Sequence, residues 1–453
     1  MSAPNFSVSG LPVLVVGAAR SGVAAAYLLA RRGARVTLTD RKPEIPEAAD
    51  LEAAGVCLEL GGHVPQSFET AALVVMSPGV PLDLPEVARA RGLGIPVIGE
   101  LELASRWLRG PIVAITGTKG KSTTTTLVGR MLQAAGRRVM VGGNIGYPVS
   151  AQVEDSTADT VHVIEASSFQ LEATDTFRPW IAALLNFSPD HLDRHPDEAA
   201  YAAAKSRIFA NQQAQDWAVI NADSAEALRM AEHTRAQVVR YAIDDVERAE
   251  VHASRGFVWQ KTSEGDVPLL PLAAVQLAGR HMLSNVVAAT AISHLAGATE
   301  ASLAQALEGF TGLEHVMEPV GRRGGVRFIN DSKATNVDAA ARSIESFDKV
   351  VAIVGGKYKG GDFADLANPL RAHGRAVVAI GEARPMVRAA LAEVVPVTDA
   401  GSLADAVRQA WDLAVPDGVV LLAPACSSFD MFRDYADRGA RFKEEVQRLI
   451  AEP

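Results

Sequence analysis

The chain has 453 residues, of which 48% are hydrophobic and 21% charged, as expected for an ordinary globular protein of two to four domains. Its net charge of -9 argues against a broad surface for nucleic acid or acidic membranes, because phosphate backbones require a basic face. The two cysteines lie far apart, there is no signal-peptide pattern, and no apolar run reaches the roughly 18 residues of a membrane helix, so we expect a cytoplasmic protein without disulfides.

The first segment predicts a parallel βαβ unit. A β-branched run at 11–17 ends in glycine, a small-residue helix follows at 21–32, and a second strand covers 35–40. A further strand at 73–76 ends at the turn Ser77-Pro78-Gly79. The turn after the first strand, with Asp40 ending the second, resembles a dinucleotide fingerprint, but Ala19 replaces the glycine that lets a backbone approach a pyrophosphate. A site for another nucleotide or diphosphate is therefore favoured over a nicotinamide site.

The second segment carries the strongest single motif. A strand at 111–115 runs directly into Thr-Gly-Thr-Lys-Gly-Lys-Ser at 116–122, and a threonine-rich helix follows. Such a loop presents backbone N–H groups and a helix N-terminus to phosphates, with Lys121 reaching the β- and γ-phosphates and Ser122 binding Mg²⁺. The loop is short, since Ile115 stands where the usual P-loop has its first glycine. The alternative is a glycine-rich turn with an incidental Lys-Ser pair.

Further strands at 161–164, 181–185 and 218–220, a β-rich hairpin at 251–270 and a helix at 285–296 complete this segment. Glu165 follows the first of these strands, where α/β folds place a Mg²⁺ ligand, although it could instead cap the next helix. The cluster 190–195 contains two histidines and two aspartates, which serve either as ligands or as structural hydrogen-bonding groups. Lys205, in a helical stretch at 201–209, reads from composition as a solvated lysine with a smaller chance of a functional role.

The third segment has strands at 326–329, 350–354, 376–380 and 419–422. Polar loops at 330–336, 355–363 and 424–430 follow three of them. The Gly, Asn, Asp and Ser residues of each loop alone could simply form turns, where these residues are common. Together the three loops predict a second substrate site at one edge of a sheet.

Alternating strands and helices throughout predict three α/β domains. They are a Rossmann-like N-terminal domain (1–105), a P-loop ATPase-like central domain with a parallel sheet (106–311) and a Rossmann-like C-terminal domain (312–453). The linkers near 105 and 311 are the predicted hinges.

These motifs, in this order, resemble the Mur ligase superfamily over essentially the whole chain. The resemblance rests on the loop at 116–123, Gly-Gly-Asn-Ile-Gly at 142–146, the stretch 165–172, the cluster 190–195, Lys205 and the three C-terminal loops. The loops at 330–336 and 424–430 are most similar to the branch that adds D-glutamate.

The resemblance implies an ADP-forming, ATP-dependent ligase of peptidoglycan precursor synthesis that acts on small molecules. We expect a monomer that binds neither nucleic acid nor membrane. D-glutamate would be joined to UDP-N-acetylmuramoyl-L-alanine through an acyl phosphate, with two Mg²⁺ ions. The open alternatives are a related ligase that adds L-glutamate or another amino acid, a folate-type ligase, and a non-catalytic nucleotide-binding regulator.

The resemblance also implies site residues. Lys121, Glu165, His191 and Lys205 would be catalytic, and Ser122, Glu165, His191 and, if carbamylated by CO₂, Lys205 would hold metal. Nucleotide contacts would come from Gly117, Thr118, Lys119, Gly120, Lys121, Ser122, Thr123, Asn285 and Asp331. The UDP-sugar substrate would contact Arg20, Ser21, Asp40, Arg41, Ser77, Gly79 and Asn144, and the incoming glutamate and phosphates would contact Lys333, Thr335, Lys359, Ser428 and Tyr435.

Some positions depart from the family pattern. Val316 stands where an arginine is usual and Met282 where an asparagine is common, so we expect altered contacts with the nucleotide. Lys119 replaces a frequent asparagine in the phosphate loop.

Overall fold

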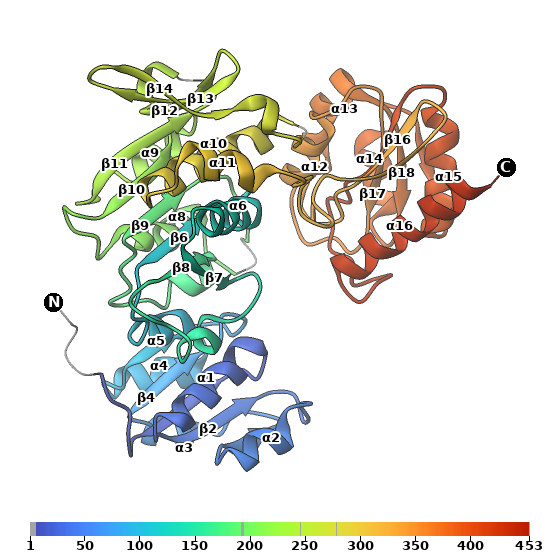
Figure 1. Ribbon diagram of the computed structural model, residues 1–453. Coiled ribbons are helices and arrows are strands. Elements are labelled where there is room, and N and C mark those ends of the chain that lie inside the picture. The colour runs from blue at the N-terminus through green and yellow to red at the C-terminus, as the bar shows by residue number, and fades with distance from the viewer. Residues whose placement is uncertain (1–5, 192–193, 245, 278, 453) are drawn as a thin grey trace. The chain divides into compact units, whose positions relative to one another are not determined.

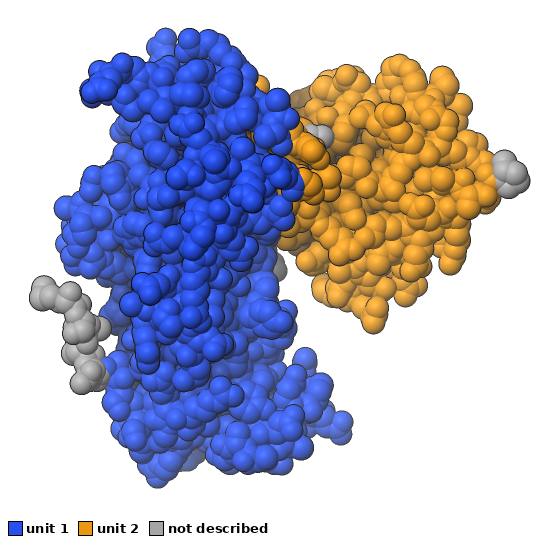
Figure 2. All heavy atoms as spheres, in the orientation of Figure 1, with its two compact units in different colours: residues 1–274, 285–308 blue, residues 275–284, 309–453 orange. Residues whose placement is uncertain are grey.

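The computed structural model describes residues 6–191, 194–244, 246–277 and 279–452, and in these ranges the chain forms three sheets (Figure 1). Residues 1–274 and 285–308 make one compact unit, and residues 275–284 and 309–453 make a second (Figure 2). None of the helices in the described ranges is long and apolar enough to cross a membrane. The domain boundaries near 105 and 311 stay predictions.

The N-terminal sheet of the first unit has five parallel strands in the order β3-β2-β1-β4-β5. Alternate residues of β1 belong to two different hydrophobic cores. Val13 and Val15 lie in one core, and Leu14 and Val16 lie in the other. Helices therefore cover both faces, as in a Rossmann-like fold. The strands are β1 (Pro12–Val16), β2 (Arg35–Asp40), β3 (Cys57–Leu60), β4 (Leu73–Met76) and β5 (Val97–Gly99), and the helices are α1 (Arg20–Arg31), α2 (Ala48–Ala53), α3 (Pro65–Thr70), α4 (Pro85–Gly92) and α5 (Glu100–Ser105).

The central sheet has the order β14-β13-β12-β11-β10-β9-β6-β8-β7 and is parallel from β7 to β12. The predicted hairpin at 251–270 is confirmed as the antiparallel strands β12 to β14. The strands are β6 (Ile112–Thr116), β7 (Arg138–Gly143), β8 (Thr160–Glu165), β9 (Ile181–Leu184), β10 (Trp217–Asn221), β11 (Gln237–Ala242), β12 (Val251–Ser254), β13 (Phe257–Thr262) and β14 (Gly265–Pro271).

The helices of this region include α10, which begins five residues before the predicted start at 285, because Gly279, with φ of 98°, turns the chain into the helix. The helices are α6 (Lys121–Ala134), α7 (Ser168–Leu171), α8 (Glu198–Ser206), α9 (Ala225–Met230), α10 (Arg280–Leu295) and α11 (Glu300–Leu307), with 3-10 turns η1 (Val149–Gln152), η2 (Arg207–Phe209), η3 (Val246–Arg248) and η4 (Leu272–Ala274).

Two buried glutamates of α5 join the N-terminal sheet to loops of the central region. Glu102 Oε2 accepts hydrogen bonds from the amides of Asp175, Thr176 and Phe177, at 2.8, 3.0 and 2.9 Å. Glu100 Oε1 accepts one from the Ser150 amide at 2.6 Å. Backbone donors compensate part of the water lost by these carboxylates, and Glu102 Oε1 also accepts from Arg106 Nε at 2.8 Å and from the Thr176 hydroxyl at 2.6 Å.

The C-terminal sheet, in the second unit, has the order β15-β16-β20-β17-β18-β19, with only β15 antiparallel. Since β16, β20 and β17 are adjacent and parallel, the three predicted polar loops that follow them open at one edge. The strands are β15 (Glu318–Arg323), β16 (Val326–Asn330), β17 (Val350–Gly355), β18 (Gly374–Ile380), β19 (Val397–Asp399) and β20 (Val419–Leu422), and the helices are α12 (Val337–Ile344), η5 (Phe363–Leu366), α13 (Ala367–His373), α14 (Arg384–Leu391), α15 (Leu403–Ala414) and α16 (Tyr435–Ala451).

Candidate active site

The loop between β6 and α6 has the shape of an anion-binding helix N-terminus. Gly120 precedes the helix with φ of 80°, and a Cβ there would overlap the side-chain oxygen of buried Asn285. Both the left-handed backbone and the neighbouring amide therefore require glycine. The first amides of α6 have no partner within the helix, so they are suited to bind phosphate beside Lys121 and Ser122.

Two lysine ammonium groups converge on one carbonyl oxygen of this loop. Lys121 Nζ donates to the Gly117 and Thr118 carbonyls at 2.8 and 3.0 Å, and Lys205 Nζ donates to Gly117 at 2.8 Å. Lys205 is 1% exposed, so its interpretation as a solvated lysine was wrong. Burial, and then the charge of Lys121, hold the pKa of Lys205 well below its usual value.

The ring of Tyr201 lies under this buried ammonium, with Lys205 Nζ 4.6 Å from the ring centre. The Tyr201 hydroxyl is 3.3 Å from Thr118 Oγ1 and is itself buried. Sequence reasoning missed Tyr201, although its spacing of four residues from Lys205 places both on one face of α8.

Glu165 ends β8, which pairs with β6 so that Ile115 lies opposite Glu165. Its Oε1 accepts a hydrogen bond from Asn144 Nδ2 at 2.6 Å, whereas its buried Oε2 has no hydrogen-bond partner among the described residues. The alternative that Glu165 caps the next helix is wrong, because Ser167 caps α7 in a capping box with Gln170. A buried carboxylate oxygen without a partner has the chemistry of a metal ligand.

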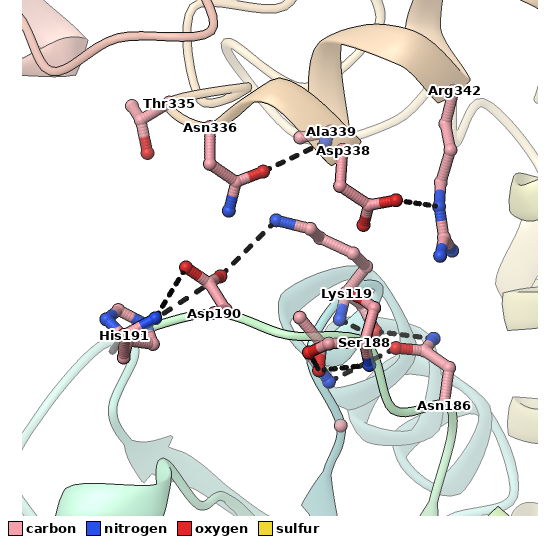
Figure 3. A network of polar contacts seen from close by, with 12 residues as sticks. Lys119, Asn186, Ser188, Asp190, His191, Thr335, Asn336, Asp338, Ala339 and Arg342 are labelled. Carbon is pink, nitrogen blue, oxygen red and sulfur yellow. Dashed lines mark hydrogen bonds and ion pairs between the residues drawn. The ribbon is translucent and has the colours of Figure 1, made fainter. Parts of the chain in front are cut away.

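The segment after β9 brings Asp190 and His191 toward the phosphate loop (Figure 3). Lys119 Nζ lies 3.5 Å from Asp190 Oδ2, and the His191 amide donates to Asp190 Oδ1 at 2.9 Å. His195, from the same predicted cluster, is buried, bonds Ser168 Oγ at 3.0 Å and stacks on Phe169. Asp193 of that cluster lies outside the described residues.

The N-terminal sheet carries a separate cavity of about 290 Å³ at the ends of its strands. Asp40 is held at its rim, accepting from the Ala18 amide at 2.6 Å and the Lys42 amide at 2.8 Å. Arg20 does not line this cavity; its guanidinium donates to the Gly146 carbonyl at 2.8 Å. The lining residues are Gly17, Ala19, Asp40, Arg41, Lys42, His63, Ser77, Gly79, Val80, Pro81 and Leu84.

Four of the substrate residues predicted from the sequence, Asp40, Arg41, Ser77 and Gly79, thus share this cavity, and Ser21 is not among its lining residues. Sequence reasoning missed His63, which bonds Thr39 Oγ1 at 3.0 Å. It follows Gly61 and Gly62 directly after β3, and this glycine pair is the signal that could have marked the position.

In the second unit, the predicted residues gather in pairs at the edge formed by β16, β17 and β20. Lys359 Nζ lies 3.5 Å from Thr335 Oγ1, and Lys333 Nζ lies 6.0 Å from the centre of the Tyr435 ring. Asp331 is buried and accepts from the Met317 amide at 3.2 Å and from the Ser343 hydroxyl. Ser428 is also buried.

Buried Arg438 joins two of these loops and was missed by sequence reasoning. Its guanidinium donates to Ser332 Oγ at 2.9 Å, to the Ser332 carbonyl at 2.8 Å and to the Cys426 carbonyl at 3.2 Å. Burial lowers the pKa of Arg438 to about 10. Its spacing of four residues from Phe442 and eight from Val446 places it on the buried face of α16, a signal that could have separated it from the exposed arginines of this helix.

Comparison with known proteins assigns the family. Family models for the Mur ligase MurD-like N-terminal domain, the Mur ligase middle domain and the Mur ligase glutamate ligase domain match residues 12–99, 115–293 and 317–426. A UDP-N-acetylmuramoylalanine–D-glutamate ligase from Acidobacterium capsulatum is 45% identical over 447 residues, which cover 97% of each chain. The chain belongs to the Mur ligase family. A ligase of the same name from Koribacter versatilis is 42% identical and covers 98% of this chain and 99% of its own.

Solved structures of Mur ligases share the fold. The UDP-N-acetylmuramate-alanine ligase MurC from Thermotoga maritima has a TM-score of 0.58 at 19% identity, covering 97% of this chain and 100% of its own. A pseudomurein peptide ligase type C from Methanothermus fervidus has a TM-score of 0.60 at 16% identity, with the same coverage. The predicted three-domain α/β fold is confirmed.

Mur ligases are ADP-forming enzymes that use ATP, in general with Mg²⁺. In this Mur ligase, Glu165 Oε2 has no hydrogen-bond partner among the described residues. This oxygen, at the end of β8, and the Ser122 hydroxyl, in the first turn of α6, are the kinds of ligand that fit such a cation. No group of three His, Cys, Asp or Glu side chains suited to a metal occurs within the described ranges.

Two of the three departures from the family pattern, Met282 and Val316, lie in the second unit of this Mur ligase. Met282 is 2% exposed and belongs to the same hydrophobic core as Ile344 and Val354. Val316 packs against that core as a partly buried residue. Both side chains therefore contribute apolar packing, and the altered nucleotide contacts stay a prediction.

Proposed function

We propose that this Mur ligase joins D-glutamate to UDP-N-acetylmuramoyl-L-alanine, with ATP cleaved to ADP and phosphate, in the synthesis of peptidoglycan precursor. The observation that carries the proposal is a chain 45% identical to a D-glutamate ligase over 97% of both lengths, with Lys121, Glu165 and Lys205 gathered at the phosphate loop. We also propose that the protein works in the cytoplasm, as a monomer, without nucleic-acid or membrane partners.

The reaction has to turn a poor electrophile into a good one. An oxygen of the L-alanine carboxylate attacks the γ-phosphorus of ATP, ADP leaves, and the acyl phosphate keeps that oxygen as its bridge. The neutral amine of glutamate then attacks the acyl carbon. The resulting tetrahedral intermediate loses a proton from nitrogen and expels phosphate together with the bridging oxygen, which leaves the amide.

Negative charge builds on phosphoryl and carbonyl oxygens in both steps, so fixed positive groups are what the protein has to supply. Lys121 and the first amides of α6 are suited to hold the transferred phosphoryl group. On arrival of a nucleotide, we expect Lys121 to exchange the Gly117 and Thr118 carbonyls for phosphate oxygens, which are stronger acceptors.

Ser122 and Glu165 would hold one Mg²⁺, and His191 with Lys205, if carbamylated, would support a second. When bound, Mg²⁺ neutralises phosphate charge and aligns the oxygens of the transferred group. Carbamylation adds CO₂ to an uncharged amine with loss of one proton, and the lowered pKa of buried Lys205 favours the uncharged form. Mass spectrometry of the intact protein in bicarbonate, with Lys205→Met as the control, tests this modification.

The remaining substrates are assigned to the other two domains. We assign the UDP group to the cavity beside Asp40 and Ser77, with Asn144 and Arg20 toward the muramoyl end. The loops with Thr335, Lys359 and Ser428 are assigned to D-glutamate, since a lysine and hydroxyl donors suit a dicarboxylic amino acid.

The test is phosphate release from ATP with Mg²⁺ and UDP-N-acetylmuramoyl-L-alanine, comparing D-glutamate, L-glutamate and no amino acid. We expect release only with D-glutamate, together with a product heavier by one glutamyl residue. Release with L-glutamate alone would keep the chemistry and overturn the assigned amino acid. No release in any arm, beside an active control ligase, would overturn the substrate assignment.

A further inference from the structure

The side chain of Asn186, two residues beyond β9, makes three hydrogen bonds to the phosphate loop (Figure 3). Its Oδ1 accepts from the amides of Thr118 and Lys119 at 3.1 and 2.9 Å, and its Nδ2 donates to the Lys119 carbonyl at 3.1 Å. The Asn186 carbonyl also accepts from the Thr118 amide at 3.1 Å. One carboxamide thus pairs with both sides of the same loop residue.

A second contact between the same two segments lies beside the first. Thr118 Oγ1 donates to the Ser188 carbonyl at 3.0 Å, and the Ser188 amide lies 3.1 Å from that hydroxyl. The segment then continues to Asp190, which lies 3.5 Å from Lys119. The phosphate loop and the segment 186–191 are therefore held together along their length, rather than at one point.

These bonds decide which amides of the loop remain for an anion. The Thr118 and Lys119 N–H groups are turned toward Asn186, so phosphate has to bind the amides that follow, at the N-terminus of α6. A carboxamide is suited to this task, since an aspartate lacks the donor for the Lys119 carbonyl and an aliphatic side chain lacks both groups.

We propose that Asn186 is a positioning residue that sets the phosphate loop in its nucleotide-binding shape and fixes it to the segment that carries Asp190 and His191. The part that concerns turnover rests on the proposed function. The part that concerns nucleotide binding does not, because any ligand with a β-phosphate at this loop would depend on the same amides.

Asn221 offers a matched control. It is a buried asparagine on the neighbouring strand β10, and its Nδ2 donates at 2.9 Å to the carbonyl of Leu185, the residue just before Asn186. Its Oδ1 accepts from the Asp223 amide at 3.0 Å, so its two bonds hold the end of β9 and the turn after β10 rather than the phosphate loop. Loss of either side chain should loosen that strand end, but only loss of Asn186 should alter the loop.

The experiment measures ADP binding by calorimetry in the presence of Mg²⁺ for the full chain, Asn186→Ala and Asn221→Ala, with the melting temperature of each. We expect Asn186→Ala to weaken ADP binding about tenfold and Asn221→Ala to stay within about twofold of the parent chain. In turnover, Asn186→Ala should raise KM for ATP and leave the KM values for the other two substrates within about twofold.

Unchanged ADP binding in Asn186→Ala, an equal loss in Asn221→Ala, or a common rise of all three KM values would overturn the proposal. If Asn186→Ala fails to fold, Asn186→Asp replaces it: this variant keeps the acceptor for both amides, and ADP binding equal to that of the parent chain would contradict the assignment. A parent chain that binds ADP but forms no amide would overturn the proposed function, while the binding series would still test Asn186.

Discussion

Two glycine loops, at 17–22 and at 117–122, follow the first strand of their sheets and lead into a helix, yet their surroundings differ. In the first, a Cβ on Gly17 would lie 2.6 Å from Val80 Cγ2 and 2.9 Å from Ser77 Cβ, and the Ala18 amide donates to Asp40, so the loop packs against elements of its own sheet beside the cavity. In the second, the loop meets Asn285, Asn186 and Lys205, which are all polar and come from other elements.

The difference teaches that a glycine-rich strand–helix turn supplies only a helix N-terminus, and that the groups brought to it decide between binding and chemistry. The glycine loop at 17–22 should therefore determine the affinity for the UDP substrate. The phosphate loop at 117–122 should determine the rate of the reaction.

Removal of the Lys121 ammonium should nearly abolish turnover. In Lys121→Ala we expect kcat/KM to fall about a thousandfold or more, because a charge directed at the transferred phosphoryl group is lost. Phosphate release in the presence of all substrates measures it. Lys261→Ala is the control, since Lys261 Nζ also donates to two carbonyls, those of Val246 and Glu247, but lies on β13. Equal losses in both variants would contradict the assignment.

Glu165→Gln should lower kcat roughly a hundredfold and raise the Mg²⁺ concentration needed for half-maximal rate. Glutamine keeps an oxygen to accept from Asn144 but loses the negative charge of the buried oxygen that has no partner. A titration of rate against Mg²⁺ at saturating ATP measures the effect. An unchanged Mg²⁺ dependence would mean that Glu165 does not hold the cation.

A pair of glycine substitutions compares the two loops directly. Gly17→Ala should raise KM for the UDP substrate about tenfold with little change in kcat, because its Cβ would crowd Val80 and Ser77 at the cavity. Gly120→Ala should instead lower kcat/KM for ATP, because its Cβ would displace Asn285. Measurement of kcat and of KM for each of the three substrates distinguishes the two variants. If both variants changed the same parameter, the proposed division of roles would fail.

The smallest effect concerns stability and leaves the reaction untouched. Burial lowers the pKa of His162, on β8, to about 4, and its Nε2 lies 2.8 Å from Ser156 Oγ. Between its ordinary pKa of 6.5 and about 4 the unfolded chain binds a proton that the folded chain does not. The free energy of unfolding should therefore decrease as pH falls through this range.

Glutamine at this position can still bond Ser156 and does not titrate. His162→Gln should lose less stability than the parent chain in that range, by up to about 1.4 kcal/mol per pH unit for one proton. Urea unfolding at pH 6.5, 5.5 and 4.5 measures how the free energy of unfolding of each protein changes with pH. Parallel slopes would show that His162 contributes nothing to acid sensitivity.

The sequence predicted those features that depend on local pattern. The β-branched run ending in Gly17 and the Gly-Lys-Ser motif after 115 specify strand, loop and helix within a few residues, and the structure has them there. Asp40 was found in the same way, as the acidic residue that ends the second strand of a βαβ unit.

What the sequence could not predict depends on contacts between distant segments. Lys205 looks like any helical lysine until β6 and α8 meet, which buries it against Gly117. Asn186 has no feature in the sequence beyond its place after a strand. Its contact with Thr118 forms only because β6 and β9 pair. The bonds of Arg438 to Ser332 likewise depend on a loop far away in the sequence.

The most direct test of the central claim follows an oxygen atom through the reaction. UDP-N-acetylmuramoyl-L-alanine labelled with ¹⁸O in the alanine carboxylate is converted with D-glutamate and ATP, and the released phosphate is analysed by mass spectrometry. If the phosphate loop activates the carboxylate by phosphorylation, each phosphate formed with an amide should carry one carboxylate oxygen. Phosphate free of label, formed while amide accumulates, would contradict the account.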